Sequence, residues 1–230
     1  MIGSAMKSLF KSSASELKKK FSKTSEDDEF ATPLGLRMGA AVDIDTLPLR
    51  MHVDDLHMPL PDTTIIIVAQ GYIDLGDGTY VHRYYAEDDA MIQVLTVNGM
   101  DDQHVKETTL YMPYESYYPG SEGEWAQWTA KGGRIGQTTY GLDDGSKFER
   151  IWFDDTDGYA DPVTFWEEVY EDPELDEHSK ILHRAMLYGR NLEDGKKNEY
   201  LMVSVESCDG EETVEVMIGV DLELSMLKVI

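Results

Sequence analysis

Short hydrophobic runs alternate with paired turn residues along most of the chain. Asp-Gly and Asn-Gly pairs tolerate the positive φ that tight hairpin turns demand. They occur at positions 77–78, 98–99, 144–145, 157–158, 194–195 and 209–210. In one of the runs between them, Leu201, Val203 and Val205 recur at every second position, which is the period of a half-buried strand. The pattern predicts a mainly β body built from antiparallel hairpins.

The turn pairs also place the expected strands. In chain order these are residues 64–75, 79–85, 135–140, 147–153, 187–192, 199–207 and 213–220. Such strands fit a sandwich or a barrel-like sheet, and an α+β arrangement is a further interpretation.

One or two short helices compete for a place in this body. Asp172 suits an N-cap and Pro173 the first helical position, and the apolar residues among 175–186 would form the buried stripe. The turn at 194–195 needs an arriving strand by about Leu187, so this helix should be short or absent. Residues 163–170 fit either a strand or a helix.

The first segment carries a helical pattern instead. Its apolar residues recur at steps of three and four, and a helix would gather them into one stripe among lysines. They are Ile2, Met6, Leu9, Phe10, Ala14, Leu17 and Phe21. We therefore expect residues 1–32 to form a basic amphipathic helix and an acidic hinge, and residues 33–230 to form the body. Two packed subdomains with a boundary near residue 120 are an alternative.

Charge also distinguishes the first 23 residues from the rest of the chain. The chain has 45 acidic and 20 basic side chains, a formal net charge of -25. Residues 1–23 contain six lysines and one glutamate, a net charge of +5, which leaves -30 for the other 207 residues. A surface this acidic repels a phosphate backbone, so we expect no nucleic-acid binding.

The sequence also indicates where the protein acts. Cys208 is the single cysteine, and the longest purely apolar run, residues 65–69, is too short to span a bilayer. The basic start lacks the apolar core and cleavage site of a secretory signal. We expect a cytoplasmic protein with peripheral contact to the inner membrane, where apolar residues enter the lipid and lysines meet anionic headgroups. The residues of this membrane or partner contact are Leu9, Phe10, Lys11, Leu17, Lys18 and Phe21.

Motifs for catalysis or metal binding are absent from the sequence. Two histidine pairs are five residues apart, a spacing that forms no local metal clamp on a helix or a strand. The acidic turn at residues 155–158 lacks the ligand positions of a calcium loop, so turn chemistry explains it. We expect no catalytic residue, no metal and no cofactor.

Aromatic residues offer a candidate ligand or partner face. Trp125 and Trp128 belong to a stretch rich in Tyr and Trp, and residues 82–85 read His82, Arg83, Tyr84 and Tyr85. Such side chains line binding faces or close a β core. In so acidic a chain, Arg83 is expected to make an internal ion pair. The glycine-rich basic stretch 131–136 is either a phosphate loop or a plain connection.

Five segments of the chain resemble a known family. Residues 32–40, 70–76, 82–85, 148–152 and 187–190 are similar to the YjfK-like family of uncharacterised bacterial proteins. The resemblance implies no known reaction. Members of that family are typically encoded beside a phage-shock-protein-A-like membrane-stress protein, small membrane proteins and a glutathionylspermidine-synthase-like ligase, which implies an accessory role in envelope stress.

We therefore expect a non-catalytic accessory or adaptor protein that binds a protein partner, a phage-shock-protein-A-like protein among the candidates. The alternative is an enzyme or binding module for a cationic small molecule such as a polyamine, which the acidic body would concentrate and aromatic faces would hold. Mimicry of nucleic acid by the acidic surface is a third interpretation.

Overall fold

The fold was analysed in a computed structural model that describes residues 32–61, 63–192, 195 and 197–230. Its strands are β1 (Ala41–Ile44), β2 (Thr64–Gly76), β3 (Thr79–Ala86), β4 (Met91–Val97), β5 (Val105–Tyr117), β6 (Thr139–Gly141), β7 (Lys147–Arg150), β8 (Val163–Tyr170), β9 (Ser179–Asn191), β10 (Asn198–Cys208), β11 (Glu211–Asp221) and β12 (Leu227–Val229). The short helices are α3 (Leu47–Arg50) and α4 (Glu122–Thr129), and brief 3-10 turns occur at Pro33–Gly35, Asp102–His104 and Leu224–Met226.

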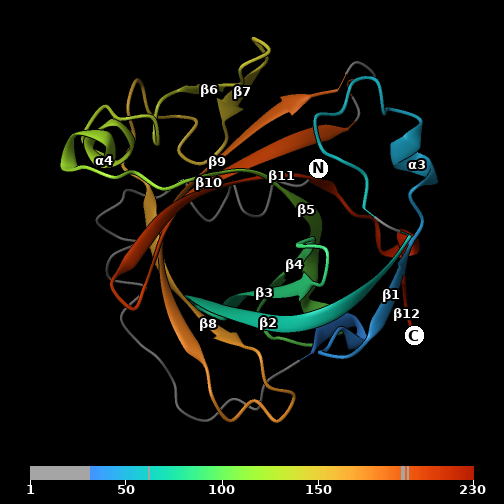
Figure 1. The fold of residues 1–230 in the computed structure, drawn as a ribbon. Helices are drawn as coiled ribbons and strands as arrows, with labels where there is room; N and C mark the ends of the chain where they lie inside the picture. Colours follow the sequence, from blue (N-terminus) through green and yellow to red (C-terminus); the bar gives the residue numbers. More distant parts are fainter. Residues whose placement is uncertain (1–31, 62, 193–194, 196) are drawn as a thin grey trace.

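Eight of the strands close into an antiparallel barrel (Figure 1). They follow the order β2-β3-β4-β5-β11-β10-β9-β8, and pairing of β8 with β2 closes the ring. Strands β1 and β12 extend the sheet from the first residues of β2, and β7 and β6 extend it from β9. The mainly β prediction is confirmed, and the ring closure selects a barrel over a sandwich.

The turn pairs account for much of this topology. Asp77 and Asp209 adopt positive φ, 53° and 50°, at the tight connections β2–β3 and β10–β11. The pair at 144–145 joins β6 to β7, although both strands are shorter than expected. The pair at 157–158 instead lies in the long connection from β7 to β8.

The helix considered for residues 172–186, which the turn at 194–195 predicted to be short or absent, is absent, and a loop and β9, which begins at Ser179, take its place. Each residue of β9 from Ser179 to Ala185 pairs with β8, which spans the ambiguous residues 163–170, so tertiary pairing overrides the local helix signals. Helix α4 was not predicted, because its sequence shows little amphipathic periodicity and Trp128 is its one buried side chain.

The predicted N-terminal amphipathic helix and acidic hinge lie outside the described residues, apart from Thr32, so they stay predictions. Among the residues that the structure describes, no helix is long and apolar enough to cross a membrane.

Candidate functional site

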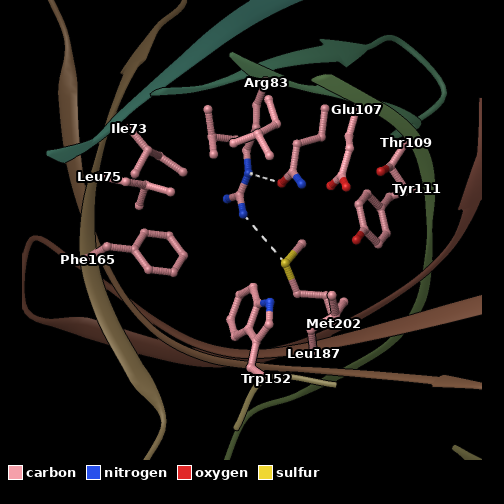
Figure 2. A pocket seen from close by; sticks show the side chains of 13 residues that line it. Ile73, Leu75, Arg83, Glu107, Thr109, Tyr111, Trp152, Phe165, Leu187 and Met202 are labelled. Carbon is pink, nitrogen blue, oxygen red and sulfur yellow. Dashed lines mark hydrogen bonds between the residues drawn. The ribbon is translucent and has the colours of Figure 1, made fainter. Parts of the chain in front are cut away.

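The barrel interior is filled by side chains, as eight strands allow. Those around its central cavity are Ile73, Leu75, Val81, Arg83, Gln93, Leu95, Glu107, Thr109, Tyr111, Trp152, Phe165, Leu187 and Met202 (Figure 2). The cavity left between them has a volume of 20 Å³, room for about one water molecule. In this conformation the interior therefore holds no space for a drug-sized ligand.

Arg83, which lines this cavity, forms a buried ion pair with Glu167. Nη1 of Arg83 donates to Oε2 of Glu167 at 2.6 Å, the hydroxyl of Tyr85 donates to Oε1 of Glu167 at 2.6 Å, and Nε of Arg83 donates to Gln93. Nε2 of His183 lies 2.9 Å from Oε2 of Glu167. Burial alone would raise the pKa of Glu167, but attraction to Arg83, the close approach of His183 and the hydrogen bond from Tyr85 lower it to about 2. The internal ion pair expected for Arg83 is confirmed.

Glycine at position 71 makes room for this pair. Gly71 lies opposite Arg83 in the β2–β3 register, and a Cβ there would overlap the carboxylate of Glu167. Gly71 and Arg83 belong to two of the segments that resemble the YjfK-like family. Both therefore have a structural reason for their identity.

The other two residues of the predicted 82–85 face are also buried. His82 and Tyr84 are each 1 % exposed, while Arg83 is 4 % exposed and Tyr85 is half-buried. The ring of His82 lies near Tyr72, and its Nε2 is 3.3 Å from the hydroxyl of Thr96. Burial lowers the pKa of His82 to about 4. These four side chains do not share an exposed surface.

A second polar cluster fastens the segment after α3 to β10. The buried carboxylate of Glu199 accepts the backbone N–H groups of His57 and Met58 at 2.7 and 2.8 Å. It also bonds Arg190, whose Nη1 lies 3.0 Å from Asp55. Arg190, which belongs to another of the segments that resemble the YjfK-like family, therefore has a structural role in this cluster.

The ring of His57 superficially resembles the centre of a catalytic triad. Nδ1 lies 3.0 Å from Glu199, and Nε2 lies 2.9 Å from the hydroxyl of Ser146. However, Nε2 is also 2.9 Å from the carboxylate of Asp144, which only accepts hydrogen bonds. Asp144 accepts the backbone N–H of Ser146 as well, so that amide is not free to stabilise an oxyanion. The arrangement holds the hairpin 139–150 in place and does not activate Ser146.

Arg150 organises the acidic turn at 155–158. Its Nη1 donates to the carbonyls of Gly136 and Gly158 at 2.8 and 2.6 Å. Its Nη2 donates to those of Phe153 and Thr156 at 3.0 and 2.5 Å. The turn thus surrounds a guanidinium group of the chain itself. Within the described ranges, no group of three or more His, Cys, Asp or Glu side chains is placed to hold a metal ion.

A further candidate site among the described residues lies on the outer surface beside α4. Three rings, Tyr117, Trp128 and Tyr140, form what we call the aromatic cage, and the guanidinium of Arg134 occupies it. The Cζ atom of Arg134 is 4.1 Å from the centre of the Trp128 ring, 5.2 Å from that of Tyr140 and 5.5 Å from that of Tyr117. Nη2 of Arg134 donates to the Tyr140 hydroxyl at 3.0 Å. A cation site therefore exists, and the chain fills it itself.

The two predicted tryptophans meet at this place but not with residues 82–85. Trp128 is buried in the aromatic cage, and Trp125, one turn earlier on α4, is half-buried. Arg134, from the glycine-rich stretch 131–136, was not recognised as part of the aromatic site. The signal that could have indicated this role is that Arg134 lies close in the sequence to the stretch rich in Tyr and Trp. The six residues predicted for membrane contact, all before residue 22, lie outside the described residues.

Fold and site together define a closed, side-chain-filled barrel whose polar groups are largely engaged internally. Residues 12–228 match the model of a protein family of unknown function, DUF2491, and the chain belongs to that family. It is 28 % identical to the uncharacterised protein YjfK of Escherichia coli (strain K12) over 205 residues, which cover 86 % of this chain and 90 % of that protein. The resemblance to YjfK is thereby confirmed. No solved structure matches the chain significantly.

Proposed function

We propose that the protein is a non-catalytic adaptor that binds a protein partner on its outer surface. The observation that carries this proposal is the filled interior, because a cavity of 20 Å³ offers no ligand site where barrels commonly have one. The His57 cluster supports it, since its groups are saturated by contacts within the chain.

The basic N-terminal segment adds a membrane contact to this proposal. Its lysines, Lys11 and Lys18 among them, would approach anionic headgroups while Leu9, Leu17 and Phe21 enter the lipid interface. The protein would then act in the cytoplasm at the inner membrane, with a phage-shock-protein-A-like stress protein as the candidate partner.

Two assays on the full-length chain test the adaptor. Purified protein is mixed with the phage-shock-protein-A-like protein of the same cells, and complex formation is measured by co-purification. Sedimentation with anionic vesicles compares the wild type with the double variant Lys11→Glu, Lys18→Glu, which should bind the vesicles less. Failure to recover this or any other protein partner would contradict the adaptor, and equal sedimentation of both proteins would remove the membrane contact.

The aromatic cage favours one alternative, a binding module for cationic small molecules. Its rings are arranged as in sites that hold ammonium or guanidinium groups. A polyamine would have to displace Arg134 from it, so we rank this function second.

A further inference from the structure

Arg134 differs from the other arginines of the described residues because its guanidinium lies among three aromatic rings. Arg83, Arg184 and Arg190 each pair with a carboxylate, Arg37 and Arg150 bond backbone carbonyls, and Arg50 bonds the hydroxyl of Thr46. Arg134 is exposed, and no carboxylate of the described residues lies within 4.0 Å of it. In so acidic a protein, an exposed guanidinium that has no carboxylate partner among the described residues is a cation available to another molecule.

The surrounding loop holds this guanidinium in place. The backbone N–H of Arg134 donates to the carbonyl of Gln127 at 2.7 Å, and the side chain of Gln137 bonds the carbonyls of Gly132 and Gly133 at 2.7 and 2.8 Å. Stacking on Trp128 restricts the side chain itself. A pre-ordered arginine loses little conformational entropy when it binds, which favours affinity.

Residues that are close to the aromatic cage along the chain have side chains that are common in protein interfaces. Tyr118 is 73 % exposed, Trp125 is half-buried and Lys131 is exposed. Arg, Trp and Tyr dominate the energetics of protein interfaces. The nearby Glu124 is directed to the start of α4, where its carboxylate accepts the N–H of Gly120 at 2.7 Å.

We propose that the exposed side of the aromatic cage, which we call the α4 face and define by Arg134 and by Tyr118, Trp125 and Lys131 next to the cage residues in the chain, receives a carboxylate-bearing segment of a protein partner. The rings support the guanidinium, and its N–H groups not bonded to Tyr117 and Tyr140 face an Asp or Glu side chain of the partner. An apolar partner residue packs on Tyr118. The negative charge of the rest of the body is screened beyond about 8 Å at physiological salt. The inference rests on the proposed adaptor function and names the chemistry of the partner.

The four tryptophans provide the test, because their indole N–H groups give separate NMR signals. The full-length protein is titrated with a short peptide of alternating glutamate and leucine. We expect the signals of Trp125 and Trp128 to move and those of Trp152 and Trp166 to stay. Arg134→Gln should weaken binding about tenfold or more, since a charge-assisted pair is lost. Arg37→Gln, at another exposed arginine, should leave binding unchanged.

Several results would overturn the inference. A control peptide in which glutamine replaces each glutamate could move the same signals equally. Arg37→Gln could weaken binding as much as Arg134→Gln, or the glutamate peptide could move none of the signals. Anionic vesicles that move the signals when the peptide does not would reassign the face to lipid. An unchanged Trp152 signal in Arg134→Gln verifies that this variant is folded. Arg134→Lys is a second variant, and because it keeps the positive charge but loses the planar guanidinium, we expect intermediate binding.

Failure of this inference can be told from failure of the adaptor. If the partner co-purifies equally with wild type and Arg134→Gln, the α4 face is not the site although the adaptor stands. If neither protein recovers a partner, the proposed function itself fails.

Discussion

Single residues in the barrel interior carry large electrostatic energies because their surroundings are dry. Arg83 is 4 % exposed, and the side chain of Glu167 is 0 % exposed. A buried ion pair adds little net stability relative to an apolar pair, but removing one partner leaves an uncompensated charge. The stability of the barrel should therefore depend on keeping both residues or replacing both.

Glu167→Gln should lower the free energy of unfolding by about 3–5 kcal/mol, because Arg83 loses its counter-ion. The double variant Arg83→Met, Glu167→Leu should recover most of that loss. Urea denaturation measures both. The neighbouring Glu168→Gln is the matched control, since its pair with Lys180 is at the surface and contributes about 1 kcal/mol or less. A Glu167→Gln loss no larger than that of Glu168→Gln would contradict the buried pair.

His82 should make stability depend on pH. Burial lowers its folded-state pKa from 6.5 to about 4, so the unfolded chain binds its proton first as the pH falls. Stability from this group is full above about pH 6.5 and decreases toward pH 4, by an amount on the order of 3 kcal/mol. In urea denaturation at pH 7 and 4.5, His82→Gln should show a smaller pH dependence than the wild type. His178→Gln, at an exposed histidine, should retain the full dependence, and the same reduction there would contradict the prediction.

At the scale of elements, the sequence predicted several hairpins between neighbouring strands, but it did not predict pairings between distant segments. The turn at 77–78 predicted the β2–β3 hairpin because both strands adjoin it in sequence. Arg83 was expected to form an ion pair, but its partner is 84 residues away and carries no local signal. Helix α4 escaped prediction since only Trp128 is buried, and a helix with one buried residue leaves no periodic pattern.

The connection from β7 to β8 should depend on Arg150 for its order. Arg150→Gln would leave carbonyls of Gly136, Phe153, Thr156 and Gly158 without their donors, so residues 153–158 should open locally. Hydrogen exchange should show faster exchange there and unchanged protection in β3. The surface variant Arg184→Gln should alter neither segment. Equal protection of residues 153–158 in Arg150→Gln and wild type would show that the arginine does not order the loop.

The aromatic cage should accept a foreign cation only when its own is removed. Arg134→Ala leaves the rings of Tyr117, Trp128 and Tyr140 without a guanidinium, so spermidine should raise its melting temperature more than magnesium does at equal ionic strength. Wild type should respond to both cations alike. A spermidine-specific shift in wild type would instead support the cation-binding alternative.

At the scale of the molecule, barrel closure could not be predicted from the sequence, because the pattern of strands fitted both a sandwich and a barrel. Closure depends on pairing β2 with β8 and β5 with β11, and these strands are far apart in the chain. The segments resembling the YjfK-like family contain Gly71, Arg83, Arg150 and Arg190, which hold the barrel and its loops together. Their roles explain why the resemblance identified the family without revealing a site.

The central claim is that the filled barrel binds its partner outside. The most direct test is affinity purification from the cells in which the chain is native, comparing full-length wild type, Met202→Leu in the interior and Arg134→Gln on the α4 face. Met202→Leu nearly conserves volume, so the barrel should stay folded. We expect the same protein partner to be recovered with wild type and Met202→Leu, and to be depleted about tenfold with Arg134→Gln. Loss of the partner with Met202→Leu and retention with Arg134→Gln would contradict binding at the outer surface.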